Sequence, residues 1–103
     1  VRAALNAYSK ALSLDLAPHG ITVNTVNLGG VFTDRIQKLF KKIADTEKVS
    51  TTKKIKEAEA SIPMKRFAKP EEVAYLIDFL CSRKADYITG QIISIDGGLS
   101  KSI

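Results

Sequence analysis

The first seventeen residues have apolar side chains at helical spacing, in two neighbouring stripes. One stripe consists of Leu5, Tyr8, Leu12 and Leu16, and the other of Ala4, Ala7, Ala11 and Leu14. Pro18 and Gly20 predict that the helix ends near residue 17. The pattern already runs at residue 1, with no Ser, Thr, Asp or Asn before it to cap the helix. A helix with an end but no beginning predicts a fragment, cut within an element.

Two short apolar runs predict strands. Residues 21–27 (ITVNTVN) are rich in β-branched side chains and are bounded by glycines, and residues 90–96 (GQIISID) precede two more glycines. The first run does not alternate strictly between apolar and polar residues, which favours a strand covered on both faces. More than sixty residues with helical patterns separate the runs, so a parallel pairing through a crossover is expected. Two strands alone do not make a stable sheet, which again indicates a missing part.

The segment between the two runs has three helical patterns. Residues 33–47 carry an apolar face, and residues 45–63 (DTEKVSTTKKIKEAEASIP) predict exposed helix broken by a Ser–Thr–Thr loop. Residues 69–85 (KPEEVAYLIDFLCSRKA) have the strongest helix signals. Pro70 stands in the first turn, two glutamates follow it, and Arg83 and Lys84 are expected to complement the opposite end. The order of elements predicts an α/β fold.

The charge is concentrated in one segment. The chain has a net charge of +5, but residues 35–69 alone hold eleven Lys or Arg and four Asp or Glu. Such a segment can attract an anionic substrate, and the alternative is a solvated helical face without a partner. No aromatic residue lies among the lysines from 41 to 65, so a nucleic-acid partner is not expected.

The composition bears on the cellular compartment, on metal sites and on membrane partners. The chain has a single cysteine, Cys81, in an apolar helical context, and it is expected to be a small buried residue. One cysteine cannot form an internal disulfide or a cysteine-rich metal site, so a cytoplasmic location and no metal are expected. No apolar run is long enough to cross a bilayer, so no membrane partner is expected.

The loop after the first predicted strand, residues 27–34 (NLGGVFTD), is the candidate site for chemistry. In open parallel sheets, ligands bind beyond the carboxyl ends of the strands. Gly29 and Gly30 allow close approach of the backbone, Thr33 has a hydroxyl, and Asp34 can cap the next helix. A plain tight turn is the alternative explanation of the two glycines.

Several separate motifs occur in the order and spacing of one family. AALNAYSKALSLDLAPHGITVNTVNLGGVFT and IPMKRFAKPEEVAYLIDFLCSRKADYITGQIISIDGG resemble the C-terminal part of the short-chain dehydrogenases/reductases. The resemblance implies the C-terminal part of a doubly wound, Rossmann-type parallel sheet that is incomplete in this chain. It places residues 1–103 in the C-terminal half of one domain, with a substrate lid at about 34–62. The half with the glycine-rich phosphate loop, the catalytic Ser and the catalytic Tyr is absent.

The resemblance also implies roles for single residues. The family's Pro-Gly turn falls on Leu28 and Gly29, where the nicotinamide end of NAD or NADP binds in relatives, and Gly30 belongs to the same cofactor-binding loop. Val31 resembles the residue whose backbone pairs with the carboxamide, and Thr33 resembles the hydroxyl that contacts carboxamide or phosphate. The candidate substrate contacts in the lid are Ile36, Leu39 and Phe40, for which packing within the lid is the alternative.

Two residues depart from the family pattern. Leu28 replaces the proline of the turn, and Arg2 stands where the catalytic lysine is expected. In the family, this lysine binds the nicotinamide ribose and lowers the pKa of the catalytic tyrosine. Arginine keeps the positive charge, but its wide guanidinium does not reproduce a compact ammonium. Arg2 is therefore a candidate catalytic residue, with a structural salt bridge or a degenerate site as alternatives.

The function that the resemblance implies is hydride transfer between NAD(P) and a carbonyl or alcohol. V-R-A-A-L at the start and T-D-R at 33–35 resemble a subset commonly called 3-oxoacyl-[acyl-carrier-protein] reductases, so a small molecule or an acyl thioester is the expected substrate. A non-catalytic binding or assembly module is the alternative. The first helix and the C-terminal strand are expected to join a homodimer or homotetramer. His19 is expected in a surface turn, and Arg66 and Asp96 are expected to be structural.

Overall fold

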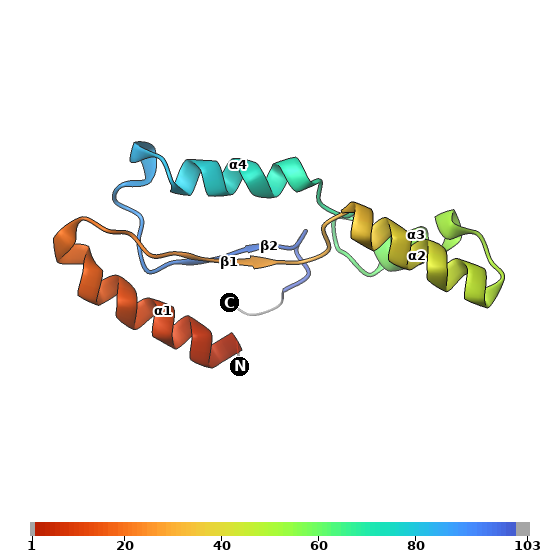
Figure 1. Ribbon diagram of the computed structural model, residues 1–103, viewed down its shortest axis with the longest axis horizontal. Coiled ribbons are helices and arrows are strands. Elements are labelled where there is room, and N and C mark those ends of the chain that lie inside the picture. Colours follow the sequence, from red (N-terminus) through yellow and green to blue (C-terminus); the bar gives the residue numbers. More distant parts are fainter. Residues whose placement is uncertain (1, 101–103) are drawn as a thin grey trace. The chain divides into compact units, whose positions relative to one another are not determined.

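The computed structural model describes residues 2–100. The chain forms two compact units: the first comprises Val1–Asn27 and Ala74–Ser94, and the second comprises Leu28–Val73 and Ile95–Ile103. The elements, shown in Figure 1, are α1 (Arg2–Leu16), the 3-10 turn η1 (Ala17–His19), β1 (Thr25–Leu28), α2 (Asp34–Glu47), α3 (Thr51–Ala60), α4 (Pro70–Leu80), the 3-10 turn η2 (Arg83–Ala85) and β2 (Ile92–Ile95).

The two strands form a parallel pair, as the long crossover predicts. The Thr25 N–H donates to the Gln91 carbonyl at 2.8 Å, and the Gly29 N–H donates to the Ile95 carbonyl at 2.8 Å. The bonded residues advance in the same direction along both strands, which is the register of a parallel ladder.

The first strand is shorter than predicted, because residues 21–24 lie outside β1. Side chains add to the bonding there. The Asn24 amide nitrogen donates to the Ile88 carbonyl at 3.0 Å, and its oxygen accepts from the Gln91 N–H at 3.1 Å. The Val23 N–H donates to the Thr89 hydroxyl oxygen at 3.0 Å. The backbone also stays paired, since the Gly90 N–H donates to the Val23 carbonyl at 2.8 Å, so these side-chain bonds supplement the backbone pairing before β1.

In the first unit, α1 and the part of α4 from Ala74 onward run on opposite sides of the strands (Figure 1). The helix α1 ends as predicted, with η1 after Leu16 and Gly20 at φ +72°. It faces the chain before β2 with a small residue, Ser13, which is 1% exposed and whose hydroxyl donates to the Lys10 carbonyl at 2.6 Å. Leu5, Tyr8 and Leu14 remain 57%, 65% and 65% exposed. The apolar stripes of α1 are therefore mostly open.

Two expectations for the end of α4 are wrong. The last turn of α4 contains no basic residue, because the helix ends at Leu80 and both Arg83 and Lys84 lie in η2. Cys81 is exposed rather than buried. The physical reason is an early helix stop: the Ser82 hydroxyl donates to the Phe79 carbonyl at 2.6 Å, and Ser82 adopts an extended backbone.

The second unit contains the helical pair α2 and α3. A break separates two helices, as predicted, but it lies at residues 48–50 rather than at the Ser–Thr–Thr sequence, because Ser50 caps α3 and the two threonines already belong to that helix. Lys48 adopts the left-handed conformation that ends α2, and the Ser50 hydroxyl oxygen caps α3 by accepting from the Lys53 N–H at 3.1 Å. Ala44 of α2 is fully buried.

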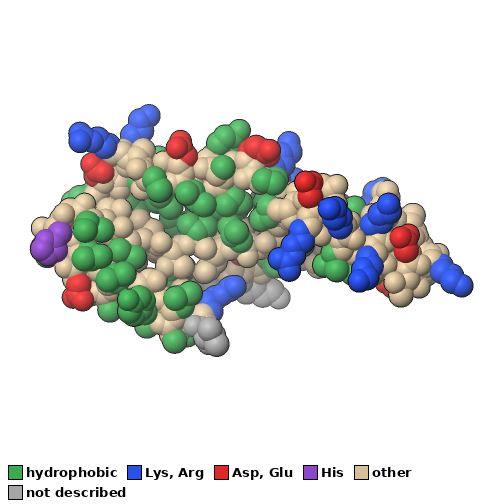
Figure 2. All heavy atoms as spheres, in the orientation of Figure 1, with side chains coloured by type: hydrophobic (Ala, Val, Ile, Leu, Met, Phe, Trp, Pro, Cys, Tyr) green, Lys and Arg blue, Asp and Glu red, His purple; other side chains and the backbone are tan. Residues whose placement is uncertain are grey.

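The surface agrees with the charge pattern of the sequence. Figure 2 shows many Lys and Arg side chains over α2 and α3. None of the helices within residues 2–100 is long and apolar enough to cross a membrane.

Candidate functional site

The loop after β1, residues 28–33, is held by one short parallel bridge. The Phe32 N–H donates to the Ala68 carbonyl at 2.8 Å, and the Ala68 N–H donates to the Gly30 carbonyl at 2.9 Å. This pattern turns the N–H and carbonyl of the middle residue, Val31, toward the opposite edge. The Val31 carbonyl accepts from the Thr33 N–H at 3.0 Å. Across residues 2–100, the structure shows no acceptor for the Val31 N–H, which leaves it available to a ligand.

The two glycines of the loop lie where the chain approaches itself. A Cβ on Gly29 would lie 2.7 Å from the Cβ and 2.8 Å from the Cα of Asp96, and one on Gly30 would lie 2.5 Å from Cδ1 of Phe67. Neither glycine has a positive φ. Internal packing therefore explains why both positions lack a side chain, and their contact with a cofactor stays a prediction.

Thr33 ends the loop and begins α2. Its hydroxyl oxygen accepts from the Ile36 N–H at 3.3 Å, which makes Thr33 the helix cap. The expectation that Asp34 would be the cap is wrong: Asp34 lies in the first turn, where its charge complements the helix dipole. The hydroxyl proton of Thr33 is not used in the cap, so Thr33 can still donate to a ligand.

An aromatic cluster of Phe32, Phe67 and Phe40 lies beside this loop. The rings of Phe32 and Phe67 stack at 5.8 Å between centroids with 11° between planes, and Phe40 of α2 meets Phe67 at 5.8 Å and 43°. Of the three, only Phe40 is predicted from the sequence as a site residue. Phe67 lies in a loop without periodicity, so hydrophobic patterning cannot identify its partners.

The candidate lid residues lie together on α2. Ile36 and Phe40 are half-buried and Leu39 is 50% exposed. Further along α2, a shallow hollow of about 320 Å³ is lined by Leu39, Lys42, Ile43, Thr46 and Glu47. This part of α2 thus offers an apolar surface with the ammonium group of Lys42 beside it.

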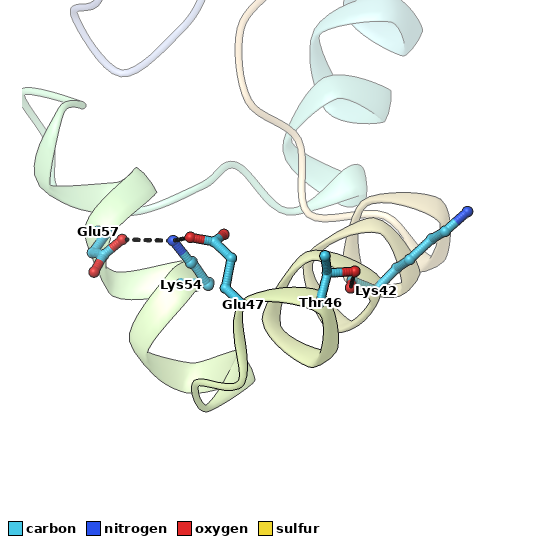
Figure 3. A network of polar contacts seen from close by, with 5 residues as sticks. All are labelled: Lys42, Thr46, Glu47, Lys54 and Glu57. Carbon is cyan, nitrogen blue, oxygen red and sulfur yellow. Dashed lines mark hydrogen bonds and ion pairs between the residues drawn. The ribbon is translucent and has the colours of Figure 1, made fainter.

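An ion-pair network joins α2 to α3 (Figure 3). Lys54 Nζ lies 2.8 Å from a Glu47 carboxylate oxygen and 3.4 Å from a Glu57 oxygen. The hydrogen bond to Glu47 raises the pKa of Lys54 above its ordinary value. The two helices therefore have a polar connection in addition to their short loop.

Arg66 and Asp96 have structural roles, as expected. Arg66 NH1 and NH2 donate to the two Glu72 carboxylate oxygens at 2.6 and 2.9 Å, and the Lys69 N–H donates to the same carboxylate at 2.9 Å. The Asp96 carboxylate accepts from the backbone N–H groups of Gly98 at 3.0 Å and Ser100 at 2.9 Å, which shapes the turn after β2.

The Arg66–Glu72 pair predicts a loss of stability in acid. The Arg66 hydrogen bonds, and then the Lys69 N–H, lower the pKa of Glu72 from 4.5 to about 2. Because the folded pKa is depressed, the pair stabilises fully above the ordinary pKa, and this contribution is lost as the pH falls from 4.5 toward 2. We expect Glu72→Gln to lower the melting temperature at neutral pH and to have a vanishing effect near pH 2. Thermal unfolding across this range checks the expectation.

Glu71→Gln is the matched control, since Glu71 lies in the same turn of α4 and makes no ion pair among the described residues. Equal effects of the two substitutions at every pH would contradict the assignment.

Arg2 is the first residue of α1 in the first unit and is exposed. Its catalytic role stays a prediction from sequence resemblance, and Val1, which precedes it in the V-R-A-A-L motif, lies outside the described residues. His19 is exposed in η1, as expected. Within residues 2–100, no group of three or more His, Cys, Asp or Glu side chains is arranged to hold a metal ion.

Nearly the whole chain matches known proteins in sequence. A family model described as enoyl-(acyl carrier protein) reductase matches residues 1–100. NADPH-dependent reductase BacG of Bacillus subtilis (strain 168) is 46% identical over 103 residues, which are 100% of this chain and 40% of BacG. The 3-oxoacyl-[acyl-carrier-protein] reductase FabG of Aquifex aeolicus (strain VF5) is 40% identical over 98 residues, or 95% of this chain and 35% of that protein.

The comparison with solved structures points to the same kind of protein. A crystal structure of a short chain dehydrogenase family protein from Francisella tularensis subsp. tularensis SCHU S4 matches with a TM-score of 0.85 and 41% identity, over 94% of this chain and 40% of that one. The chain thus spans less than half the length of the relatives it matches.

Proposed function

Because the chain belongs to the short-chain dehydrogenase/reductase family, we propose that the complete protein transfers a hydride between NAD or NADP and a carbonyl or alcohol substrate. The observation that carries this proposal is the pair of unused donors after β1, the Val31 N–H and the Thr33 hydroxyl. Both follow the carboxyl end of a parallel strand, where ligands of open α/β sheets bind. BacG, a relative, is named as an NADPH-dependent reductase, which supports NADPH as the first cofactor to test.

The residues of the loop fit the nicotinamide end of such a cofactor. A carboxamide needs a hydrogen-bond donor for its oxygen, and the Val31 N–H is a backbone donor whose position is set by the bridge to Ala68. Thr33 adds a second donor, and Leu28, which is half exposed, adds apolar surface for the ring. When bound, the cofactor supplies or accepts the hydride, and the chain contributes binding and orientation.

Arg2 is proposed to take the electrostatic part of the role that lysine has in the family. A guanidinium remains charged across the physiological pH range, so it can stabilise a neighbouring ionised group or a ribose hydroxyl. It cannot give up a proton, so Arg2 is assigned to charge stabilisation and binding rather than to proton transfer.

The lid favours an anionic substrate with an apolar part, and we propose an acyl thioester on a carrier, such as a 3-oxoacyl group, in which the carrier supplies the negative charge. Leu39 exposes half of its side chain on α2, and Lys42 lies beside it in the same hollow. The relative from Aquifex aeolicus is named as a 3-oxoacyl-[acyl-carrier-protein] reductase, which is consistent with this substrate class.

Assembly and location are further parts of the proposal. The exposed Leu5 and Tyr8 lie one turn apart on α1 and form an apolar face that a second copy of the protein could cover, so a homodimer or homotetramer through α1 and β2 is proposed. The lone cysteine supports a reducing, cytoplasmic compartment.

The test is a reductase assay of the complete protein. We expect oxidation of NADPH or NADH with a 3-oxoacyl thioester on an anionic carrier, with a larger kcat/KM than with a neutral ketone of equal chain length. Activity with the ketone alone would support the reductase and reject the anionic substrate. Binding of neither nucleotide in a fluorescence titration would overturn the proposed function and favour the non-catalytic binding or assembly module.

A further inference from the structure

We infer that Phe67 is a positioning residue that couples the candidate cofactor loop, residues 28–33, to the lid helix α2. The inference rests on the proposed function, because it concerns how that site is held in shape. Phe67 belongs to neither the loop nor the lid, yet it contacts both through the aromatic cluster.

On the side of the loop, the Phe67 ring packs directly against Phe32 and Gly30. Its ring stacks on Phe32 with centroids 5.8 Å apart, and its Cδ1 lies where a Cβ of Gly30 would come within 2.5 Å. The next residue, Ala68, exchanges backbone hydrogen bonds with Gly30 and Phe32. A shift of the half-buried Phe67 ring toward the loop would press on the backbone at Gly30, and a shift of the chain at Ala68 would disturb both hydrogen bonds that hold Val31 in place.

On the lid side, the link is Phe40. This residue lies within α2, after the Thr33 cap, and its ring meets Phe67 at 5.8 Å. The helix α2 is thus attached to the loop twice: through the chain at Thr33, and through the side-chain path from Phe40 to Phe67 to Phe32. Two attachments determine the direction of a helix, whereas one leaves it free to pivot.

This double attachment has a consequence for the binding of substrate and cofactor. A lid displaced by substrate would change the position of the Val31 N–H, the proposed carboxamide donor, without touching the cofactor. Binding at the two subsites is then coupled, and the coupling passes through the ring of Phe67.

Hydrogen exchange of single backbone amides, followed by NMR on the complete protein, tests this coupling. Phe40→Leu removes the lid contact and leaves the Phe32–Phe67 stack in place. Since an aromatic pair contributes measurably beyond its buried area, we expect about tenfold faster exchange at the Phe32 amide, which donates to Ala68, as well as along residues 36–40. Phe67→Leu is expected to accelerate exchange at both places by at least as much.

Phe79→Leu is the matched control, because Phe79 is 41% exposed on α4 in the first unit and belongs to no aromatic pair within residues 2–100. It is expected to leave exchange at Phe32 unchanged. Faster exchange along α2 alone in Phe40→Leu would overturn the coupling.

A kinetic readout separates positioning from a loss of fold. We expect Phe67→Leu to raise KM for both nucleotide and carbonyl substrate by about tenfold, with a smaller change in kcat. An increase in only one of the two KM values would also overturn the coupling. If nucleotide binds to neither wild type nor variants, the proposed function fails, while the exchange data still decide the coupling.

Discussion

Replacing Arg2 with alanine is expected to lower kcat of the complete protein by about 10²- to 10³-fold, the usual cost of removing one preorganised charged or hydrogen-bonding group from an active site. The reason is electrostatic. A positive charge at this position of the family pattern favours the ionised form of the tyrosine that the resemblance implies, and alanine removes it. Steady-state kinetics of alcohol oxidation across a pH series is the measurement. In that direction the ionised tyrosine accepts the proton, so the acidic limb of the rate profile should move to higher pH.

Two further variants make this result specific to the role of Arg2. Arg2→Lys restores the residue of the family pattern and is expected to retain or raise activity. Arg83→Ala removes an exposed guanidinium from η2 and is expected to leave kcat unchanged. A kcat of Arg2→Ala within a few-fold of wild type, with an unmoved pH profile, would show that Arg2 has no part in catalysis.

Replacing Gly90 with alanine should produce a large loss of stability, through both backbone strain and overpacking. Gly90 has φ +72°, a conformation that costs an L-residue about 1–2 kcal/mol. An added Cβ would also lie 2.9 Å from the buried Ser13 hydroxyl oxygen and 2.8 Å from Lys10 Nζ. Lys10 can move away, but Ser13 is held by its hydrogen bond, so overpacking should add about 1–3 kcal/mol.

Gly20→Ala separates the two contributions. Gly20 has the same φ of +72°, but its Cβ would meet nothing within 4 Å. Urea unfolding of both variants should give a loss of about 1–2 kcal/mol for Gly20→Ala and a clearly larger loss for Gly90→Ala. Equal losses would mean that α1 does not pack against Gly90 as described.

Local signals along the chain were sufficient for most of the elements. The helix stop at Pro18 and Gly20, the break near Ser50 and the start of α4 at Pro70 all follow from backbone chemistry that acts over a few residues. Parallel pairing also follows, since the crossover between the strands is too long for a hairpin. Motif order identified the family, and the comparisons confirm it.

The partners of single residues did not follow from the sequence. Gly29 and Gly30 suggested room for a ligand, yet the chain's own Asp96 and Phe67 occupy the adjacent space. Thr33 rather than Asp34 caps α2, although both residue types are good caps. Cys81 has an apolar neighbourhood in the sequence, but it lies beyond the end of α4 and is exposed.

The elements could be predicted and the partners of single residues could not, and this difference has a physical cause. Helix ends, turns and amphipathic stripes depend on interactions between residues a few positions apart, so they are written in the local order of side chains. The contact of Phe67 with Gly30 and Phe32 joins residues more than thirty positions apart in the chain. Such a contact depends on where the strands and helices that flank each loop place that loop in space. The elements and the family of this protein can therefore be predicted from its sequence. The packing that shapes its candidate site is decided only when the backbone is folded.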